Sequence, residues 1–281
     1  MNFQQLKKVA AFYGRFTFSF TQLGFRARRP FWPAFKGDFA GEHWLVTGGS
    51  NGLGHAIGIE AARRGAQVLL AARSPQKLAQ AVSDAAAAGV KRLDTAVCDF
   101  SLQSDTARFV REFAASDRKI DVLVNNVGVL NTRHSLTGEG RETSFVTNCL
   151  SHYLLTEGLI RHGSFGSNRP LVINMTSGGG YNVPLNTGTL NMVDPKTFNG
   201  TAAYGFHKRA QMVLNRHWRE KYGPAGFTFY VMHPGWADTD GVKRSLPRFR
   251  KILRPILRDS ASGADTDGLP AAPRNRPRRS A

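Results

Sequence analysis

The feature that most constrains the fold is a regular alternation of short β-rich runs with longer helical runs, which starts near Gly41. Such serial alternation predicts a parallel sheet with right-handed crossovers. We therefore expect an α/β, Rossmann-like, doubly wound three-layer sandwich, without a seventh strand after Arg258. The expected strands are 43–47, 67–71, 91–98, 120–124, 171–175 and 227–232, and the expected helices are 52–65, 75–88, 101–115 (with Ser101 as N-cap), 138–161 and 201–222.

Composition divides the chain into three parts. Residues 1–40 are a basic, aromatic leader, whose first 37 residues contain no acid. Residues 41–258 carry the strand–helix alternation, and residues 259–281 are rich in Ser, Gly, Ala, Pro and Arg, which is typical of a disordered basic tail. The leader has three interpretations: its aromatic side chains pack on the domain, it anchors the chain at a membrane surface, or it is a mitochondrial presequence.

The charge balance is strongly basic, with 38 Lys and Arg against 20 Asp and Glu. Zinc-finger spacing, aromatic RNA-binding motifs and Gly-x-x-Gly clamps are absent, so we expect no nucleic-acid partner. No apolar run reaches the ~18–20 residues of a spanning helix. Cys98 and Cys149 lie in apolar stretches without disulfide or metal-ligand spacing. We expect an intracellular protein with no metal site, either cytoplasmic or bound peripherally to a membrane through the leader, with a mitochondrial location as the alternative.

A glycine-rich run separates the first expected strand from the first expected helix. A turn of this kind cradles the pyrophosphate of a dinucleotide at the N-terminus of the helix. Gly48 permits the tight turn, while Gly52 and Gly54 allow the phosphate and the strand to come close. The expected cofactor residues here are Thr47, Gly48, Ser50, Asn51, Gly52, Leu53 and Gly54.

Three further strand ends add expected cofactor residues. An acid after the second strand would grip the ribose hydroxyls of NAD, but Arg73 stands there and can pair with a 2′-phosphate. We therefore expect NADP(H), with NAD(H) as the alternative. Asp99 accepts from the adenine amino group or caps the next helix. Asn125 and Asn126 can satisfy loose backbone groups between strand ends, and Gly128 lets the cofactor pass close.

The run Tyr204-Gly-Phe-His-Lys208 carries the expected proton chemistry. Its phenol and ammonium stand four residues apart, on one face of a helix. A neighbouring cation lowers the pKa of a phenol, which suits a proton donor to a carbonyl. Ser177 ends the fifth strand, at the edge where open α/β sheets bind ligands, and its hydroxyl can donate to a substrate carbonyl.

These motifs stand in the order found in the short-chain dehydrogenase/reductase superfamily, which the chain resembles from about Gly41 to Thr239. The run 232–239 and the basic leader further resemble the branch called family member 12. The resemblance covers the residues 47–54 and 125–128, Asn148, Ser177, Tyr204 and Lys208, and Pro234 and Gly235 with Thr239.

The resemblance implies a role for each residue. Tyr204 would be the general acid for reduction and the base for oxidation, and Ser177 would polarise the carbonyl. Lys208 would lower the pKa of Tyr204 and hold the nicotinamide ribose, and Asn148 would keep a water in the proton relay. Pro234, Gly235 and Thr239 would line the cofactor site, and the long helices would form a homodimer or homotetramer.

The insertion at residues 179–200 resembles that of retinol-dehydrogenase-like members and implies a hydrophobic substrate pocket. It contains Tyr181, Leu185, Leu190, Met192 and Phe198. We therefore expect an NADP(H)-dependent oxidoreductase that interconverts a carbonyl and an alcohol on a lipophilic small molecule. The alternative is a catalytically inactive nucleotide-binding or membrane-associated scaffold of the same fold.

Overall fold

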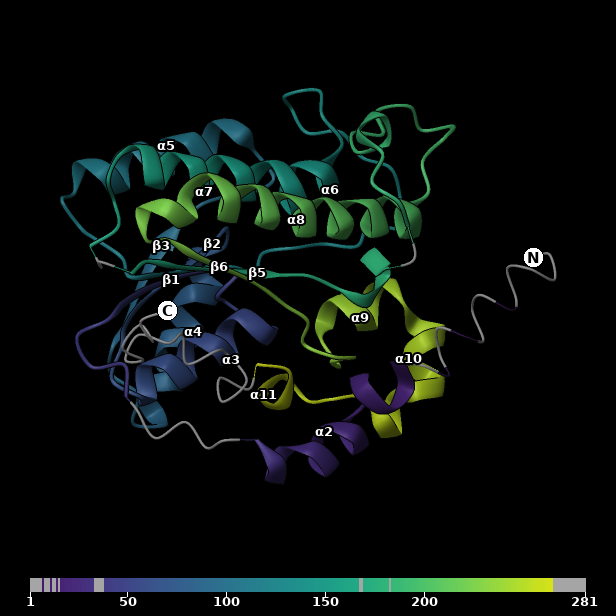
Figure 1. The fold of residues 1–281 in the computed structure, drawn as a ribbon, viewed down its shortest axis with the longest axis horizontal. Helices are drawn as coiled ribbons and strands as arrows, with labels where there is room; N and C mark the ends of the chain where they lie inside the picture. Colours follow the sequence, from purple (N-terminus) through teal and green to yellow (C-terminus); the bar gives the residue numbers. More distant parts are fainter. Residues whose placement is uncertain are drawn as a thin grey trace, which may run out of the picture.

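A parallel sheet forms the centre of the molecule (Figure 1). It has six strands in the order β3-β2-β1-β4-β5-β6. The computed structural model describes residues 7, 11, 14, 16–32, 38–166, 169–181 and 183–264. The strands are β1 (His43–Thr47), β2 (Gln67–Ala72), β3 (Leu93–Val97), β4 (Val122–Asn125), β5 (Leu171–Met175) and β6 (Thr228–Met232). Within the described residues β6 is an edge strand, as expected for a sheet without a seventh strand.

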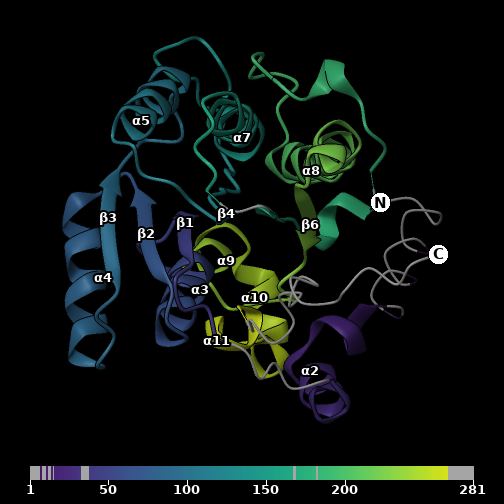
Figure 2. The same ribbon diagram turned by 60° about the vertical axis from the view of Figure 1, so that its left-hand side comes forward.

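Helices cover both faces of the sheet (Figures 1 and 2). One face carries α5 (Gln103–Ala115), α7 (Ser151–Arg161) and α8 (Gly200–Tyr222), and the other carries α3 (Gly52–Arg63), α4 (Pro75–Ala87) and α11 (Ser260–Gly263). Shorter helices are α2 (Gln22–Arg28), α6 (Thr143–Phe145), α9 (Asp240–Ser245) and α10 (Pro247–Leu253). The doubly wound sandwich is therefore confirmed.

The hydrophobic core has one half on each face of the sheet, because successive side chains of a strand point to opposite faces. On β1, Trp44 and Val46 pack in one half and Leu45 packs in the other. The strands β1, β4 and β5 are almost wholly apolar, which is the composition of a sheet buried on both sides.

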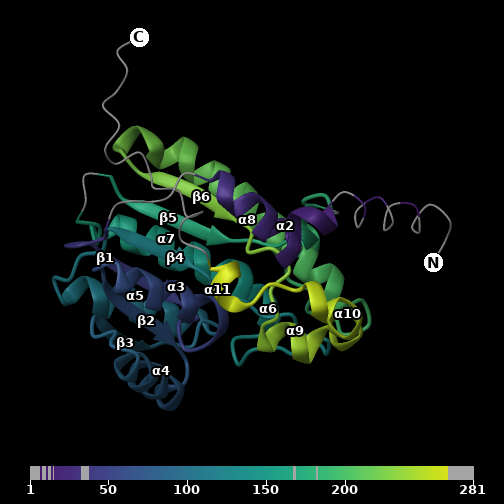
Figure 3. The ribbon, with the colours of Figure 1, turned by 90° about the horizontal axis from the view of Figure 1, so that it is seen from below.

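The folded domain extends beyond the expected limits of 41 and 258. Phe39 belongs to the core, and Ala264, only 2% exposed, packs in the same half. Residues 259–264 are therefore part of the domain rather than the start of a tail, and α11 lies beside α3 in the view from below (Figure 3). The remainder of the expected tail, residues 265–281, lies outside the described residues.

The expected helix over residues 138–161 is wrong at its start. Residues 136–142 form a turn in which Gly140 has a φ of 71°, and α6 begins only at Thr143. The buried carboxylate of Glu142 caps α6 by accepting hydrogen bonds from the amides of Ser144 and Phe145. A π-helical turn, Val146–Leu150, then leads into α7.

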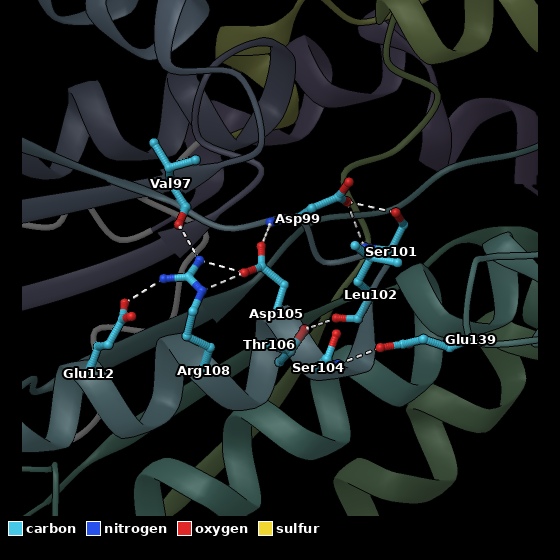
Figure 4. A network of polar contacts seen from close by, with 10 residues as sticks. All are labelled: Val97, Asp99, Ser101, Leu102, Ser104, Asp105, Thr106, Arg108, Glu112 and Glu139. Carbon is cyan, nitrogen blue, oxygen red and sulfur yellow. Dashed lines mark hydrogen bonds and ion pairs between the residues drawn. The ribbon is translucent and has the colours of Figure 1, made fainter.

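The expected cap of α5 is also wrong. The helix begins at Gln103, and Ser101 lies outside it. Instead, the carboxylate of Glu139, from the turn before α6, accepts a hydrogen bond from the amide of Gln103 (2.8 Å). It also accepts one from the amide of Ser104 (2.9 Å), which Figure 4 shows. This cap is 35 residues or more away in sequence, so a local pattern does not reveal it.

Candidate active site

The expected proton donor and its cation both lie on α8. The side chain of Asn199 caps this helix by accepting from the amide of Ala202. Nζ of Lys208 lies 5.5 Å from the ring centroid of Tyr204. Ser177, two residues after the end of β5, lies beside the same ring, since a Cβ on Gly179 would be 4.0 Å from its Oγ and 3.8 Å from Cδ1 of Tyr204. The three side chains therefore meet at the carboxyl edge of the sheet.

Burial dominates the electrostatics of this group. It raises the pKa of Tyr204, while the neighbouring hydroxyl of Ser177 acts in the opposite direction. Burial also lowers the pKa of Lys208 from 10.5 to about 8. Nζ of Lys208 donates to the carbonyl oxygen of Met175 (2.8 Å) and to Oε1 of Gln211 (3.1 Å). Contrary to expectation, burial rather than the Lys208 charge therefore determines the direction of the Tyr204 shift in this structure.

A chain of hydrogen bonds runs from Lys208 to the expected cofactor loop. Nε2 of Gln211 donates to the backbone oxygen of Asn148 (2.7 Å) and lies 3.1 Å from Nδ1 of His152. Nε2 of His152 lies 2.8 Å from the carbonyl oxygen of Val127. The sequence motifs did not reveal Gln211 and His152, although these residues follow Lys208 and Asn148 by one helical turn and so share their faces.

Asn148 lies in the π-helical turn, whose wider backbone is frequent at functional sites. Its side chain exchanges two hydrogen bonds of 2.8 Å with the backbone of Val129. Its Nδ2 also lies 3.3 Å from Nδ1 of His207. A Cβ on Gly128 would lie 3.3 Å from Oδ1 of Asn148 and 3.5 Å from Nζ of Lys208. The cofactor loop and the catalytic candidates are therefore in direct contact.

The glycine-rich turn has the geometry of an anion site. Asn51 caps α3 by accepting from the amide of Gly52 at 2.6 Å. Within the described residues, the amides of Leu53 and Gly54 have no hydrogen-bond partner, and they lie at the positive end of the helix dipole. A Cβ on Gly52 would meet only Cγ2 of Thr239, at 3.9 Å. Free donors beside open space fit the pyrophosphate of a dinucleotide.

Thr47 and Asn126 lock this turn to the neighbouring loop. Oγ1 of Thr47 accepts from the amides of Asn126 and Val127, both at 3.0 Å, and Nδ2 of Asn126 donates back to the Thr47 carbonyl. A Cβ on Gly54 would lie 2.4 Å from that Nδ2 and 2.5 Å from the Gly48 carbonyl oxygen. Only glycine fits here, as expected for close packing of helix on strand.

The side chain of Asn125 points elsewhere and joins a buried row of amides. Its Nδ2 donates to Thr156 and to Oδ1 of Asn174, each at 2.9 Å, and Asn174 donates onward to Asn215. This row spans β4, β5 and α8 beneath the site. It gives Asn125 a structural function whether or not a cofactor touches it.

Two expected cofactor residues lie after β2 and β3. Arg73 is exposed directly after β2, and within the described residues it forms no ion pair. The Asp99 carboxylate accepts from the amide (2.9 Å) and the hydroxyl (2.7 Å) of Ser101 (Figure 4). Since Glu139 caps α5, the alternative in which Asp99 is the cap is wrong. Its contact with adenine stays a prediction.

The last expected residues follow β6 on the same edge. Pro234 is buried and Gly235 has a φ of 75°. Thr239 caps α9 by accepting from the amide of Val242. The structure thus gathers the expected residues around one edge of the sheet, at the carboxyl ends of β1 to β6.

Three further features of the described residues concern metals, thiols and membranes. They contain no cluster of three or more His, Cys, Asp or Glu side chains that could hold a metal ion. Cys98 and Cys149 are buried thiols, and burial raises the pKa of both to about 12. None of the described helices has the length and apolar character needed to cross a membrane.

Residues 42–248 match the short chain dehydrogenase family. The chain belongs to this family. It is therefore an oxidoreductase of the class that acts on CH–OH and C=O groups. The resemblance drawn from the motifs is confirmed, since the matched range includes every expected site residue.

Named relatives agree with this assignment. The chain is 37% identical to human dehydrogenase/reductase SDR family member 12 over 80% of its own length and 70% of the relative's. The bovine protein of the same name is 35% identical over 93% and 82% of the two lengths. Mouse retinol dehydrogenase 12 is 30% identical over 79% and 70%.

Solved structures share the fold. A short-chain dehydrogenase from Burkholderia cenocepacia, solved in complex with NADP, superimposes with a TM-score of 0.63 at 23% identity. The match covers 80% of this chain and 88% of that one.

Proposed function

We propose that the chain is an NADP(H)-dependent oxidoreductase that interconverts a carbonyl and an alcohol on a lipophilic small molecule. The observation that carries the proposal is that Ser177, Tyr204 and Lys208 meet: a Cβ on Gly179 would lie 4.0 Å from Oγ of Ser177 and 3.8 Å from Cδ1 of Tyr204, and Nζ of Lys208 lies 5.5 Å from the centroid of the Tyr204 ring. A hydroxyl pair beside a buried cation can bind a carbonyl oxygen and deliver a proton to it.

Each side chain has a separate task in this proposal. Tyr204 donates its phenolic proton to the substrate oxygen in reduction and accepts it in oxidation. Ser177 donates a hydrogen bond to the same oxygen and stabilises the charge that develops there. Lys208 favours the phenolate through its charge. Asn148 holds the backbone of Val129 in place through two hydrogen bonds. The dinucleotide, when bound, supplies or accepts the hydride.

The proposed cofactor site is the carboxyl edge of β1 to β4. The free amides of Leu53 and Gly54 bind the pyrophosphate, and the exposed guanidinium of Arg73 pairs with a 2′-phosphate. The NADP bound by the Burkholderia protein supports this preference by analogy of fold alone. NAD(H) binds more weakly in this proposal, because it offers Arg73 no phosphate.

The proposed substrate is lipophilic because an apolar segment lies beside Ser177. Tyr181 is 50% exposed and Leu185 is 38% exposed in the segment that follows Ser177. Two relatives, retinol dehydrogenase 12 and retinol dehydrogenase 13, are named after a lipid-soluble substrate. Exposed apolar side chains at the mouth of a site favour a ligand that buries them.

We also propose a peripheral contact with a membrane surface, through which a lipophilic substrate would arrive. Phe18, Leu23 and Phe31 are 53%, 66% and 84% exposed in a stretch that includes the cations Arg26 and Arg29. Apolar side chains flanked by cations suit an anionic lipid interface. A homodimer through α7 and α8 is compatible with this contact, since these helices cover the opposite face of the sheet from α2 (Figure 1).

The proposal is tested by equilibrium binding of NADPH and NADH to the full chain at fixed salt. NADPH should bind more tightly, and Arg73→Asp should weaken NADPH at least about tenfold while sparing NADH. Arg111→Asp, at an exposed position on α5, is the matched control and should change neither affinity. If a folded sample binds neither nucleotide, the chain is not the proposed enzyme and the scaffold alternative takes its place.

A further inference from the structure

The N-terminal segment, residues 16–25, packs directly on the loop that follows β6. The carbonyl oxygen of Phe20 accepts a hydrogen bond of 2.8 Å from the amide of Trp236. A Cβ on Gly235 would lie 2.7 Å from the same oxygen, so a side chain at position 235 would collide with the segment. The loop 233–236 therefore depends on the segment for part of its backbone hydrogen bonding.

Arg258 links residues 16–25 to the loop 233–236. Its side chain is 7% exposed and donates to the carbonyl oxygens of Ser19 (2.8 Å), Thr21 (3.4 Å) and Pro234 (3.2 Å). Its guanidinium also lies 5.0 Å from the ring centroid of the buried Phe25. A buried guanidinium shared by three carbonyls fixes their relative positions, because each one lost would leave a buried donor without its partner.

Stacked aromatic rings extend this contact to Tyr181, which lies in the segment after Ser177. Phe20 stacks on His233 at 4.1 Å between ring centroids, and Phe16 stacks on Tyr181 at 5.7 Å. Tyr181 and His233 lie nearly parallel to each other, 6.4 Å apart. Tyr181 ends the short 3-10 helix that begins just after Ser177. The segment thus contacts both loops that border the catalytic candidates.

His233 contributes a donor without a partner. Its Nδ1 accepts from the amide of Gly235 at 2.8 Å, so the proton of the neutral ring is on Nε2. Nε2 is buried and has no hydrogen-bond partner within the described residues. Burial lowers the pKa of His233 to about 4, so the ring stays neutral near pH 7. A buried, unsatisfied donor in this position is one that a bound ligand can satisfy.

We propose that residues 16–25 are a built-in part of the ligand site, which fixes the loop 233–236 for the cofactor and forms one wall of the substrate pocket. This inference rests on the proposed function for the identity of the ligand. It assigns the rings of Phe16 and Phe20 to the site rather than to a lipid surface or an import receptor.

The test compares two apolar side chains in the full chain. Phe20→Ala removes the ring stacked on His233, and Ile252→Ala, at an exposed position on α10, is the control. We expect Phe20→Ala to weaken NADPH binding about tenfold and to speed hydrogen exchange at the Trp236 amide. Ile252→Ala should change neither. Phe20→Leu, which keeps an apolar side chain, guards against a variant that fails to fold and should give an intermediate loss.

Two outcomes separate the inference from the function on which it rests. If the wild-type chain binds NADPH and Phe20→Ala binds it equally well, with unchanged exchange at Trp236, the inference is overturned. If the wild-type chain binds no NADPH, the proposed function fails, and exchange at Trp236 then decides the matter without a ligand. Faster exchange in Phe20→Ala supports the positioning of the loop, and unchanged exchange overturns it.

Discussion

Nζ of Lys208 lies 3.1 Å from Oε1 of Gln211 and donates a hydrogen bond to it. Gln211 can present this oxygen because its Nε2 faces Nδ1 of His152. Nε2 of His152 in turn lies 2.8 Å from the Val127 carbonyl, which can only accept, so Nδ1 of the neutral ring is an acceptor. The loop at 125–128 therefore sets, through two side chains, the acceptor that faces Lys208.

The first prediction concerns Gln211→Met. The substitution removes an acceptor that favours the charged form of Lys208, whose pKa burial already lowers to about 8. The pKa should fall by about one further unit. Because Lys208 must carry its proton to act on Tyr204, the alkaline limb of kcat/KM should move to lower pH by the same amount. A pH profile of carbonyl reduction measures this shift.

Other groups near Lys208 do not titrate in the same range. Burial lowers the pKa of His152 to about 3 and that of His233 to about 4, and it also lowers the pKa of His207. Burial raises the pKa of Cys149 to about 12. Gln80→Met, at an exposed position on α4, is the matched control. A lower kcat with an unmoved alkaline limb would show that Gln211 supports the fold only.

The second prediction is that Lys208→Met stabilises the chain. Lys208 is 4% exposed, and its pKa falls from 10.5 to about 8 on burial. The unfolded chain therefore binds the proton more tightly, and below about pH 8 the buried charge costs about 3 kcal/mol. Methionine removes this cost but leaves two carbonyl groups without a donor. We expect a net gain of about 1–2 kcal/mol in the free energy of unfolding at pH 7.

The pH dependence distinguishes this effect from better packing. Wild-type stability should rise relative to the variant as the pH rises from about 8 to 10.5, because the folded chain has already released the proton. The gain of Lys208→Met should thus disappear near pH 10. Urea denaturation at several pH values measures it, with Lys77→Met at an exposed position as control. A gain that is independent of pH would contradict the electrostatic explanation.

Most of the fold could be predicted from the sequence. The buried strands β1, β4 and β5 are short apolar runs next to turn residues, and such runs carry a strong local signal. The start of α6 could not be predicted, since Gly140 and the Glu142 cap act within a turn that a helical pattern overlaps. In this turn, specific backbone contacts override the local helix propensity.

The convergence of the candidate site residues could be predicted where they follow strand ends or share a helix face. Ser177, Tyr204 and Lys208 meet because parallel strands end at one edge and α8 crosses it. The contact of Phe20 with Trp236 spans more than 200 residues, and no local pattern encodes it. The direction of the Tyr204 pKa shift could not be predicted either, because desolvation depends on how far the fold removes the phenol from water.

The third prediction concerns the turn itself. Gly54→Ala would place a methyl group 2.4 Å from Nδ2 of Asn126 and 2.5 Å from the Gly48 carbonyl oxygen. Because one of these atoms is backbone, the turn must shift, at a cost of about 1–3 kcal/mol in the free energy of unfolding. NADPH binding should weaken as well. Gly138→Ala, which meets nothing within 4 Å, is the control, and equal effects of the two would contradict the prediction.

The fourth prediction separates catalysis from binding. Tyr204→Phe removes only the phenolic oxygen from a partly buried ring that lies beside Ser177. Carbonyl reduction should fall by about 10²–10⁴-fold, while the Kd for NADPH changes little. Initial rates with a lipophilic aldehyde measure carbonyl reduction, and fluorescence titration measures the Kd for NADPH. Equal activity of variant and wild type would remove Tyr204 from the proton transfer and favour another donor.

The fifth prediction tests the cap that local patterns do not reveal. Glu139→Gln replaces one of the two oxygens that accept from Gln103 and Ser104 by an amide, so it should cost about 1 kcal/mol in the free energy of unfolding at pH 7. Although burial acts in the opposite direction, hydrogen bonds from these residues hold the pKa of Glu139 below its ordinary value.

A carboxyl group with a lowered pKa stabilises the fold above its unfolded pKa, and this stabilisation is lost as the pH falls through the folded pKa. The difference between wild type and Glu139→Gln should therefore shrink below about pH 4. Urea denaturation between acid and neutral pH measures it, with Glu220→Gln on the exposed face of α8 as the control. A difference that stays constant down to acid pH would mean that the charge of Glu139 contributes nothing, and that the turn at 136–142 supports α5 by packing alone.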